Sequence, residues 1–225
     1  MKLDLRLPTC VVTGHWNPAI FGGVDWLALQ LFNVDEGKSI EVTQVMNPQR
    51  GVLITFLQGV GIACIPGRLE FYSTDASKQA FDAIVAVMKR ALDLLPHTPV
   101  FAIGANFNFI EGDIVPEVAD RLTTPEKLKE KFRVTGASFA TAIQHNERAV
   151  LNLVREYDAV HSAINFNFHH EARNIDEAKR IASMELYDYY TQSVDLLSQV
   201  YGIEPEGCER FETDGDGQSG DGDGQ

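Results

Sequence analysis

The sequence contains few cysteines: Cys10, Cys64 and Cys208 are odd in number and lie far apart. A disulfide framework in a small domain needs an even set of cysteines, so we expect none here. Cys10 and Cys64 stand in apolar segments, where a free thiol behaves as a small hydrophobic side chain. This cysteine usage is typical of a reducing compartment, and it predicts a cytoplasmic location.

Long apolar runs are also missing. The least polar window, residues 51–67, carries no charge, but glycines and Pro66 interrupt it, and it is shorter than the ~20 apolar residues of a spanning helix. Residues 1–7 alternate charged side chains with leucines, unlike a secretory signal peptide. We therefore expect no membrane partner, and we interpret residues 51–67 as two buried strands.

Positive charge is scarce: 19 Lys and Arg stand against 32 Asp and Glu, a formal net charge of -13. Binding of nucleic acid through neutralised phosphates is therefore not expected. Residues 202–225 hold eight of the acids and a single base, Arg210, and from residue 214 onward only Asp, Gly, Gln and Ser occur. Nothing apolar there offsets the entropy of ordering. We expect one domain over residues 1–208 and a disordered acidic tail over residues 209–225.

Complete catalytic and cofactor motifs are absent. Gly37, Lys38 and Ser39 resemble the end of a phosphate loop, but Phe32 stands where that loop needs its first glycine. No serine lies in a nucleophile elbow, and no cysteine has a local catalytic signature. His169 and His170 are adjacent in a predicted strand, so they point to opposite faces and cannot easily share a metal. We expect no cofactor and no metal site.

The composition, with 44% hydrophobic and 23% charged residues, is that of an ordinary globular protein. Two segments show the three- and four-residue spacing of an amphipathic helix, one from Phe81 to Leu95 and one from Ile175 to Tyr201. Thr74 or Asp75 can cap the first helix and Asn174 or Asp176 the second. Residues 125–132 predict a small helix, and residues 18–32 favour helix over strand.

Nine segments rich in β-branched and aromatic residues predict strands. They are residues 9–15, 40–46, 52–57, 62–65, 69–73, 100–109, 134–144, 149–156 and 160–169. Short polar breaks separate the last three, which is typical of an antiparallel meander. The order of elements predicts an α+β fold, with a mostly antiparallel sheet packed against two long amphipathic helices. A repeated Asn-Phe-Asn-Phe tetrapeptide leaves an internal duplication open.

The repeated tetrapeptide is the feature that strand preference does not explain, because Asn is depleted in strands. Alternation along a strand puts the asparagines on the face opposite the phenylalanines, together with two histidines. If the two strands are neighbours, the amides and imidazoles form one hydrogen-bonding surface. The candidate ligand- or partner-binding residues are Asn106, Asn108, His161, Asn165, Asn167 and His169. The plain alternative is the solvated face of a one-sided sheet.

Two functions remain open at this point. The first is a non-enzymatic binding or assembly protein, which acts through a sheet face or edge on a protein partner or on a second copy of itself. The second is a small hydrolase- or lyase-like enzyme that uses His161 or His169 as general acid/base on the Asn-rich face. No nucleophile supports the enzyme, so we favour binding. A pocket enclosing these residues would favour the enzyme, and an open face would favour binding.

Overall fold

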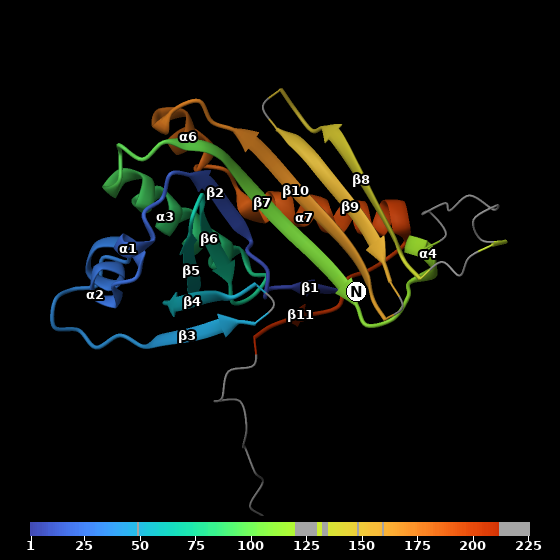
Figure 1. The fold of residues 1–225 in the computed structure, drawn as a ribbon, viewed down its shortest axis with the longest axis horizontal. Coiled ribbons are helices and arrows are strands. Elements are labelled where there is room, and N and C mark those ends of the chain that lie inside the picture. Colours follow the sequence, from blue (N-terminus) through green and yellow to red (C-terminus); the bar gives the residue numbers. More distant parts are fainter. Residues whose placement is uncertain (49, 120–129, 132–134, 148, 159, 212–225) are drawn as a thin grey trace, which may run out of the picture.

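A sheet of eleven strands organises the part of the chain that the structure describes, which is all residues except 49, 120–129, 132–134, 148, 159 and 212–225. In this computed structural model the strand order is β3-β4-β5-β6-β2-β7-β10-β9-β8, and β1 pairs with both β7 and β11 (Figure 1). Every pairing is antiparallel except that of β1 with β11. The strands are β1 (Lys2–Asp4), β2 (Cys10–Gly14), β3 (Val42–Asn47), β4 (Val52–Leu57), β5 (Val60–Ile65), β6 (Arg68–Ser73), β7 (Val100–Glu111), β8 (Ala137–Gln144), β9 (Val150–Tyr157), β10 (Ser162–Glu171) and β11 (Cys208–Glu209).

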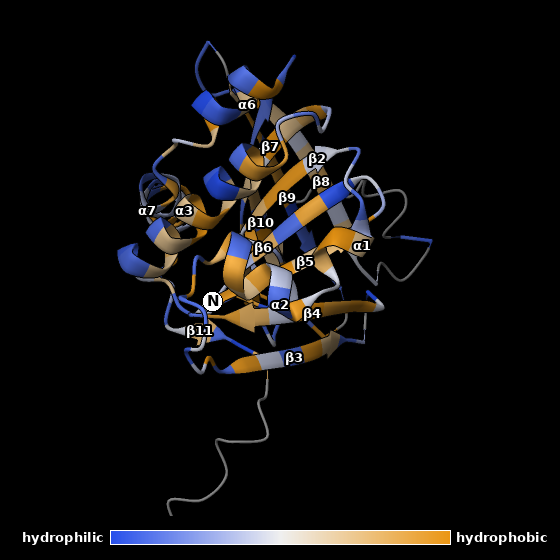
Figure 2. Ribbon diagram, turned by 90° about the vertical axis from the view of Figure 1, so that its left-hand side faces the viewer, coloured by the Kyte–Doolittle hydropathy of each residue, from blue (hydrophilic) through white to orange (hydrophobic). Residues whose placement is uncertain are grey.

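The helices bury their apolar residues in one core, on one side of this sheet. They are α1 (Pro18–Phe21), α2 (Val24–Trp26), the π-helical turn η1 (Leu27–Leu31), α3 (Lys78–Leu94), α4 (Pro116–Ala119), α6 (Ile175–Ile181), α7 (Leu186–Leu196) and the π-helical turn η2 (Leu197–Tyr201). Figure 2 shows α3 and α7 together on one side of the sheet. No helix formed by the described residues is long and apolar enough to cross a membrane.

The mixed α+β class and the antiparallel sheet agree with the sequence prediction, but the second of the two long helices does not. The periodic segment from Ile175 to Tyr201 forms two helices, α6 and α7, separated by residues 182–185. Backbone bonds from Ser183 to Arg180 and from Met184 to Ile181 turn the chain at this point. The prediction was wrong because neither Gly nor Pro marks the break, and apolar residues keep helical spacing on both sides of it.

Helix ends follow local capping chemistry. The hydroxyl of Ser77 accepts a bond from the amide of Ala80 and caps α3, in place of the predicted Thr74 or Asp75. Asn174 caps α6 through the amide of Glu177, which is one of the two predicted caps. Gly202, with φ of 69°, ends η2 in the left-handed conformation that glycine tolerates best. Phe81 of α3 and Leu197, which follows α7, are buried in the same core.

The two halves of the described chain have similar topologies, except that the first half has one additional edge strand, β3. In the first half, β2 pairs with β6, the sheet continues through β5, β4 and β3, and α3 follows β6. In the second, β7 pairs with β10, the sheet continues through β9 and β8, and α6 and α7 follow β10. The antiparallel pair of β2 and β7 joins the halves. The repeated tetrapeptide does not mark this repeat, because both copies lie in the second half, on β7 and β10.

Residues 209–211, which were predicted to begin the disordered tail, belong to the described fold. Leu3 and Asp4 of β1 pair with Cys208 and Glu209 of β11, and the ring of Phe211 lies 6.3 Å from that of Phe56, centroid to centroid. Residues 212–225, the rest of the predicted tail, lie outside the described residues. So does most of the small helix predicted over residues 125–132.

Candidate functional site

The asparagines of the repeated tetrapeptide lie side by side on the sheet face that points away from the helices. Strands β7 and β10 are neighbours, and their register pairs Asn108 with Asn165 and Asn106 with Asn167. The phenylalanines of the tetrapeptides point the other way and are fully buried in the core: Phe107, Phe109, Phe166 and Phe168. In Figure 1 these strands face the viewer, and α7 runs behind them. All four asparagines are half-buried.

A row of hydrogen-bonded amides crosses three strands on this face. The Nδ2 of Asn167 donates to the Oδ1 of Asn106 at 2.7 Å, and the Nδ2 of Asn152 on β9 donates to the Oδ1 of Asn167 at 2.9 Å. Asn152 was not among the predicted site residues. Nothing in the local sequence distinguishes Asn152. It joins the row because the register of β9 with β10 places it directly opposite Asn167. The row holds its members in one orientation, which fits a structural role as well as a binding role.

Gly104 makes room for the centre of this row. It pairs with His169 on the same face as the asparagines, and a Cβ placed at residue 104 would come within 2.8 Å of the Nδ2 of Asn167. Real Cβ atoms essentially never approach so closely. The glycine therefore allows the amide of Asn167 to lie against the backbone of β7.

The two candidate histidines do not join the asparagines in one site. His169 lies near the end of β10, while His161 precedes that strand, in the turn after β9. The Nδ1 of His161 is 2.7 Å from the carboxylate of Asp158. Eight strand positions separate the two histidines, or roughly 26 Å at the rise of an extended strand. A single small substrate therefore cannot contact both imidazoles.

His169 instead lines a cavity of about 540 Å³ at the end of the sheet, between the β8–β9 turn and α6. None of the four asparagines lines it. Its polar walls include Gln144, His169, His170, Glu171, Arg173 and Arg180. Among the described residues there is no group of three or more His, Cys, Asp or Glu that could hold a metal ion.

His170 points to the helix side, and its Nε2 lies 3.0 Å from the hydroxyl of Tyr189 on α7. Burial lowers the pKa of His170 from its ordinary value, and the nearby His169 and His145 lower this pKa further. Burial of His170 thus favours the neutral form of its imidazole.

The edge strand β8 is a second candidate site, because its outer edge, unpaired among the described strands, is open to another strand. It stands last in the strand order, so its outer edge pairs with no other described strand. Its sequence, residues 137–144, has no charged residue and no proline, the usual protections of an exposed edge. Phe139 is 54% exposed and Ile143 is 43% exposed. The guanidinium carbon of Arg155 lies 5.2 Å from the centre of the Phe139 ring.

Comparison with known protein families and with curated proteins finds no match to this chain. Its function must therefore be inferred from its own residues.

Proposed function

We propose that this chain is a non-enzymatic assembly protein that pairs edge to edge with a second copy of itself through β8. The observation that carries the proposal is the self-complementary sequence of this unprotected edge. When two copies of β8 run antiparallel with Thr141 opposite Thr141, Phe139 of each copy lies opposite Ile143 of the other. Both residues are on the helix side of the sheet, where they are exposed in the single chain.

On the opposite face of the paired strands, the side chains of the two copies also fit together without a clash of charge. Ala140 meets Ala142 of the second copy, and Ser138 meets Gln144, so small and hydrogen-bonding side chains face each other. No charge opposes a like charge within β8, although the chain as a whole carries a net charge of -13. Shifting the pairing by two residues either way separates Phe139 from Ile143. Apolar contact therefore favours the register centred on Thr141.

The asparagine face is less suited to be the main contact. Three of its amides, those of Asn106, Asn152 and Asn167, are bonded to one another. The face continues across β9 onto β8, so an edge-to-edge dimer would extend it into a second copy. We therefore propose that the asparagines stabilise the sheet to which β8 belongs and do not bind the partner themselves.

The alternative, a hydrolase- or lyase-like enzyme, now depends on His169 alone, because His161 lies at the other end of β10. The cavity of about 540 Å³ beside His169 is the observation in its favour. This alternative predicts that His169→Ala abolishes turnover of a substrate without changing the oligomeric state. The assembly proposal predicts that the same variant remains assembled and has no activity to lose.

Two double variants test the assembly and its register together. F139K/I143K places Lys opposite Lys of the second copy at both ends, while F139K/I143E places Lys opposite Glu in the same positions. Both variants put the same lysine beside Arg155, so any effect on the single chain through that contact is shared. Thermal unfolding of each variant at low protein concentration checks that the single chain still folds.

Sedimentation velocity over a range of protein concentrations provides the measurement. We expect a dimer for the unchanged chain, a monomer for F139K/I143K and a recovered dimer for F139K/I143E. A monomeric unchanged chain would overturn the proposal, as would F139K/I143K that remains dimeric. Dissociation of both variants to the same extent would overturn the register centred on Thr141.

A further inference from the structure

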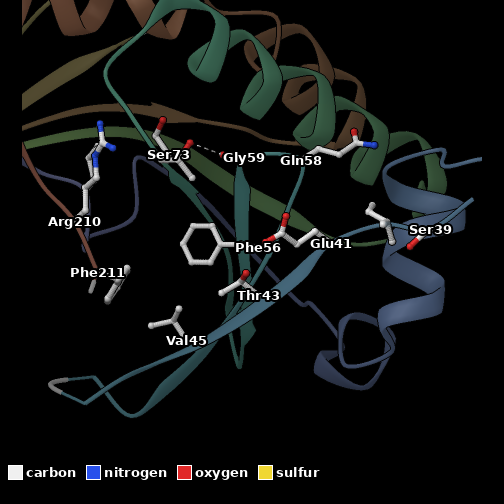
Figure 3. A pocket seen from close by; sticks show the side chains of 13 residues that line it. Ser39, Glu41, Thr43, Val45, Phe56, Gln58, Gly59, Ser73, Arg210 and Phe211 are labelled. Carbon is white, nitrogen blue, oxygen red and sulfur yellow. Dashed lines mark hydrogen bonds between the residues drawn. The ribbon is translucent and has the colours of Figure 1, made fainter. Parts of the chain in front are cut away.

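A cavity of about 550 Å³ lies between strands of the first half of the chain and the segment that follows β11, and no residue of β8 lines it. Its walls come from β3, β4, the β4–β5 turn, the end of β6 and the segment that follows β11 (Figure 3). The apolar lining consists of Leu5, Ile40, Val45, Phe56 and Phe211. Polar side chains complete the wall, and two of them, Glu41 and Arg210, are charged.

The apolar part of the cavity is centred on the ring of Phe56. Gly61 pairs with Phe56 on the neighbouring strand, and a Cβ at residue 61 would come within 2.6 Å of the Phe56 ring. The missing side chain thus allows the ring to lie over β5. Phe211 meets the same ring edge to face, with the planes at 69°. An apolar ligand would find a fixed aromatic surface here.

A tight turn and a hydrogen bond hold the rim. Gln58 and Gly59 both have positive φ, 47° and 78°, as the two-residue turn of a hairpin requires. The hydroxyl of Thr74 donates to the carbonyl of Gly59 at 3.2 Å, which ties this turn to the end of β6. The rim is therefore formed before any ligand arrives.

Arg210 supplies a cation at this cavity. The neighbouring Glu209 is directed to Lys2 and Arg6, at 3.7 and 3.8 Å. Among the described residues Arg210 itself has neither an ion pair nor a side-chain hydrogen bond. In the view of Figure 3, Arg210 and Glu41 lie on opposite sides of Phe56. The cavity thus has a cation on one side of an aromatic surface and an anion on the other.

We propose that this cavity binds a small amphipathic carboxylate, with its apolar body on Phe56 and its carboxylate on Arg210. A guanidinium presents paired N–H donors that match the two oxygens of a carboxylate. Glu41 disfavours a second anionic group at the other end and favours a hydrogen-bond donor there. The site is separate from β8, so the ligand and the assembly can be tested independently.

Three probes of matched shape and different charge test this ligand class on the full chain: naphthylacetate, naphthylethanol and naphthylethylamine. Isothermal titration should give the tightest binding for the anion and the weakest for the cation. Arg210→Gln should reduce the affinity for naphthylacetate by about tenfold or more and leave naphthylethanol nearly unchanged. Arg173→Gln, at the other cavity, is the control and should change neither affinity.

Three results would overturn the proposal. The first is no detectable binding of any probe to the unchanged chain. The second is a preference for the anion that survives Arg210→Gln, because the carboxylate would then bind elsewhere. The third is an equal loss of naphthylethanol binding in Arg210→Gln, which would show that the substitution disturbs the cavity and does not remove a charge contact. Sedimentation of the same variant should be unchanged whatever the titration gives.

Discussion

The amide of Asn167 donates to the side-chain oxygen of Asn106 at 2.7 Å, across the antiparallel pair of β7 and β10. The same amide group occupies the space that a side chain at residue 104 would fill. One contact thus links the repeated tetrapeptide, the register of β7 with β10 and the choice of glycine in β7.

Gly104→Ala should destabilise the fold by about 1 to 3 kcal/mol, as insertion of an extra methyl into a filled site does. The new Cβ would meet the Nδ2 of Asn167 at 2.8 Å, so the amide row must shift. Gly112→Ala is the matched control, because a Cβ there meets no atom within 4 Å. Urea unfolding of both variants gives the comparison. Equal midpoints would show that the row adapts without cost.

Asn167→Thr and Asn108→Thr should differ, although both residues lie on the same face of the same pair of strands. Asn167 bonds to two other amides, and its loss leaves both half-buried partners short of a bond, at about 1 to 3 kcal/mol. For Asn108, threonine is the better strand former and should change stability by less than about 0.5 kcal/mol. Thermal unfolding measures both. A larger loss of stability for Asn108→Thr than for Asn167→Thr would contradict the conclusion that Asn167 holds the amide row together.

Leu197→Ala should cost about 2 to 5 kcal/mol, as cavity-forming substitutions in a core do. Leu197 begins η2 and is fully buried in the core between helices and sheet. Val200→Ala, three residues later and 40% exposed, is the control and should cost far less. Denaturant unfolding that gave equal losses would place η2 differently from the structure.

Stability should fall as the solution becomes more acidic than the ordinary pKa of histidine, because of His170. Burial lowers the pKa of His170 below its ordinary value of 6.5, and His169 and His145 lower it further. The unfolded chain therefore takes up this proton more readily than the native chain, so the native state loses stability as pH falls through about 6.5. His170→Asn should flatten that slope in unfolding experiments at several pH values. An equally steep slope in His170→Asn would contradict this assignment.

Local signals were enough to predict most elements of the fold. Residues 52–57 form a strand with the predicted bounds, and the alternation in the tetrapeptides correctly separated asparagines from phenylalanines. The break between α6 and α7 could not be predicted, because residues 182–185 contain neither Gly nor Pro, and a single Ser183 does not interrupt the helical spacing of the apolar residues. Capping of α3 by Ser77 was missed because Thr74 and Asp75 offer the same chemistry a few residues earlier.

The candidate site shows the same division between local and long-range information. The four asparagines were found from their own sequence pattern, but Asn152 joins them only through the register of β9 with β10. His161 and His169 are an even number of residues apart, so alternation puts both on the same face of the sheet. They lie at opposite ends of β10, however, and strand alternation alone does not show this distance. The exposure of β8 depends on strand order, which pairing across the whole chain decides.

Crosslinking at Thr141 tests the edge-to-edge assembly most directly. In the proposed pairing Thr141 lies opposite its own copy, whereas two copies of Phe139 are four strand positions apart, or about 13 Å. In a chain with Cys64 and Cys208 replaced by Ser, Thr141→Cys should give a covalent dimer with a short bifunctional maleimide, and Phe139→Cys should give little. Absence of crosslinking at residue 141, or crosslinking at residue 139 of equal yield, would contradict the assembly proposed here.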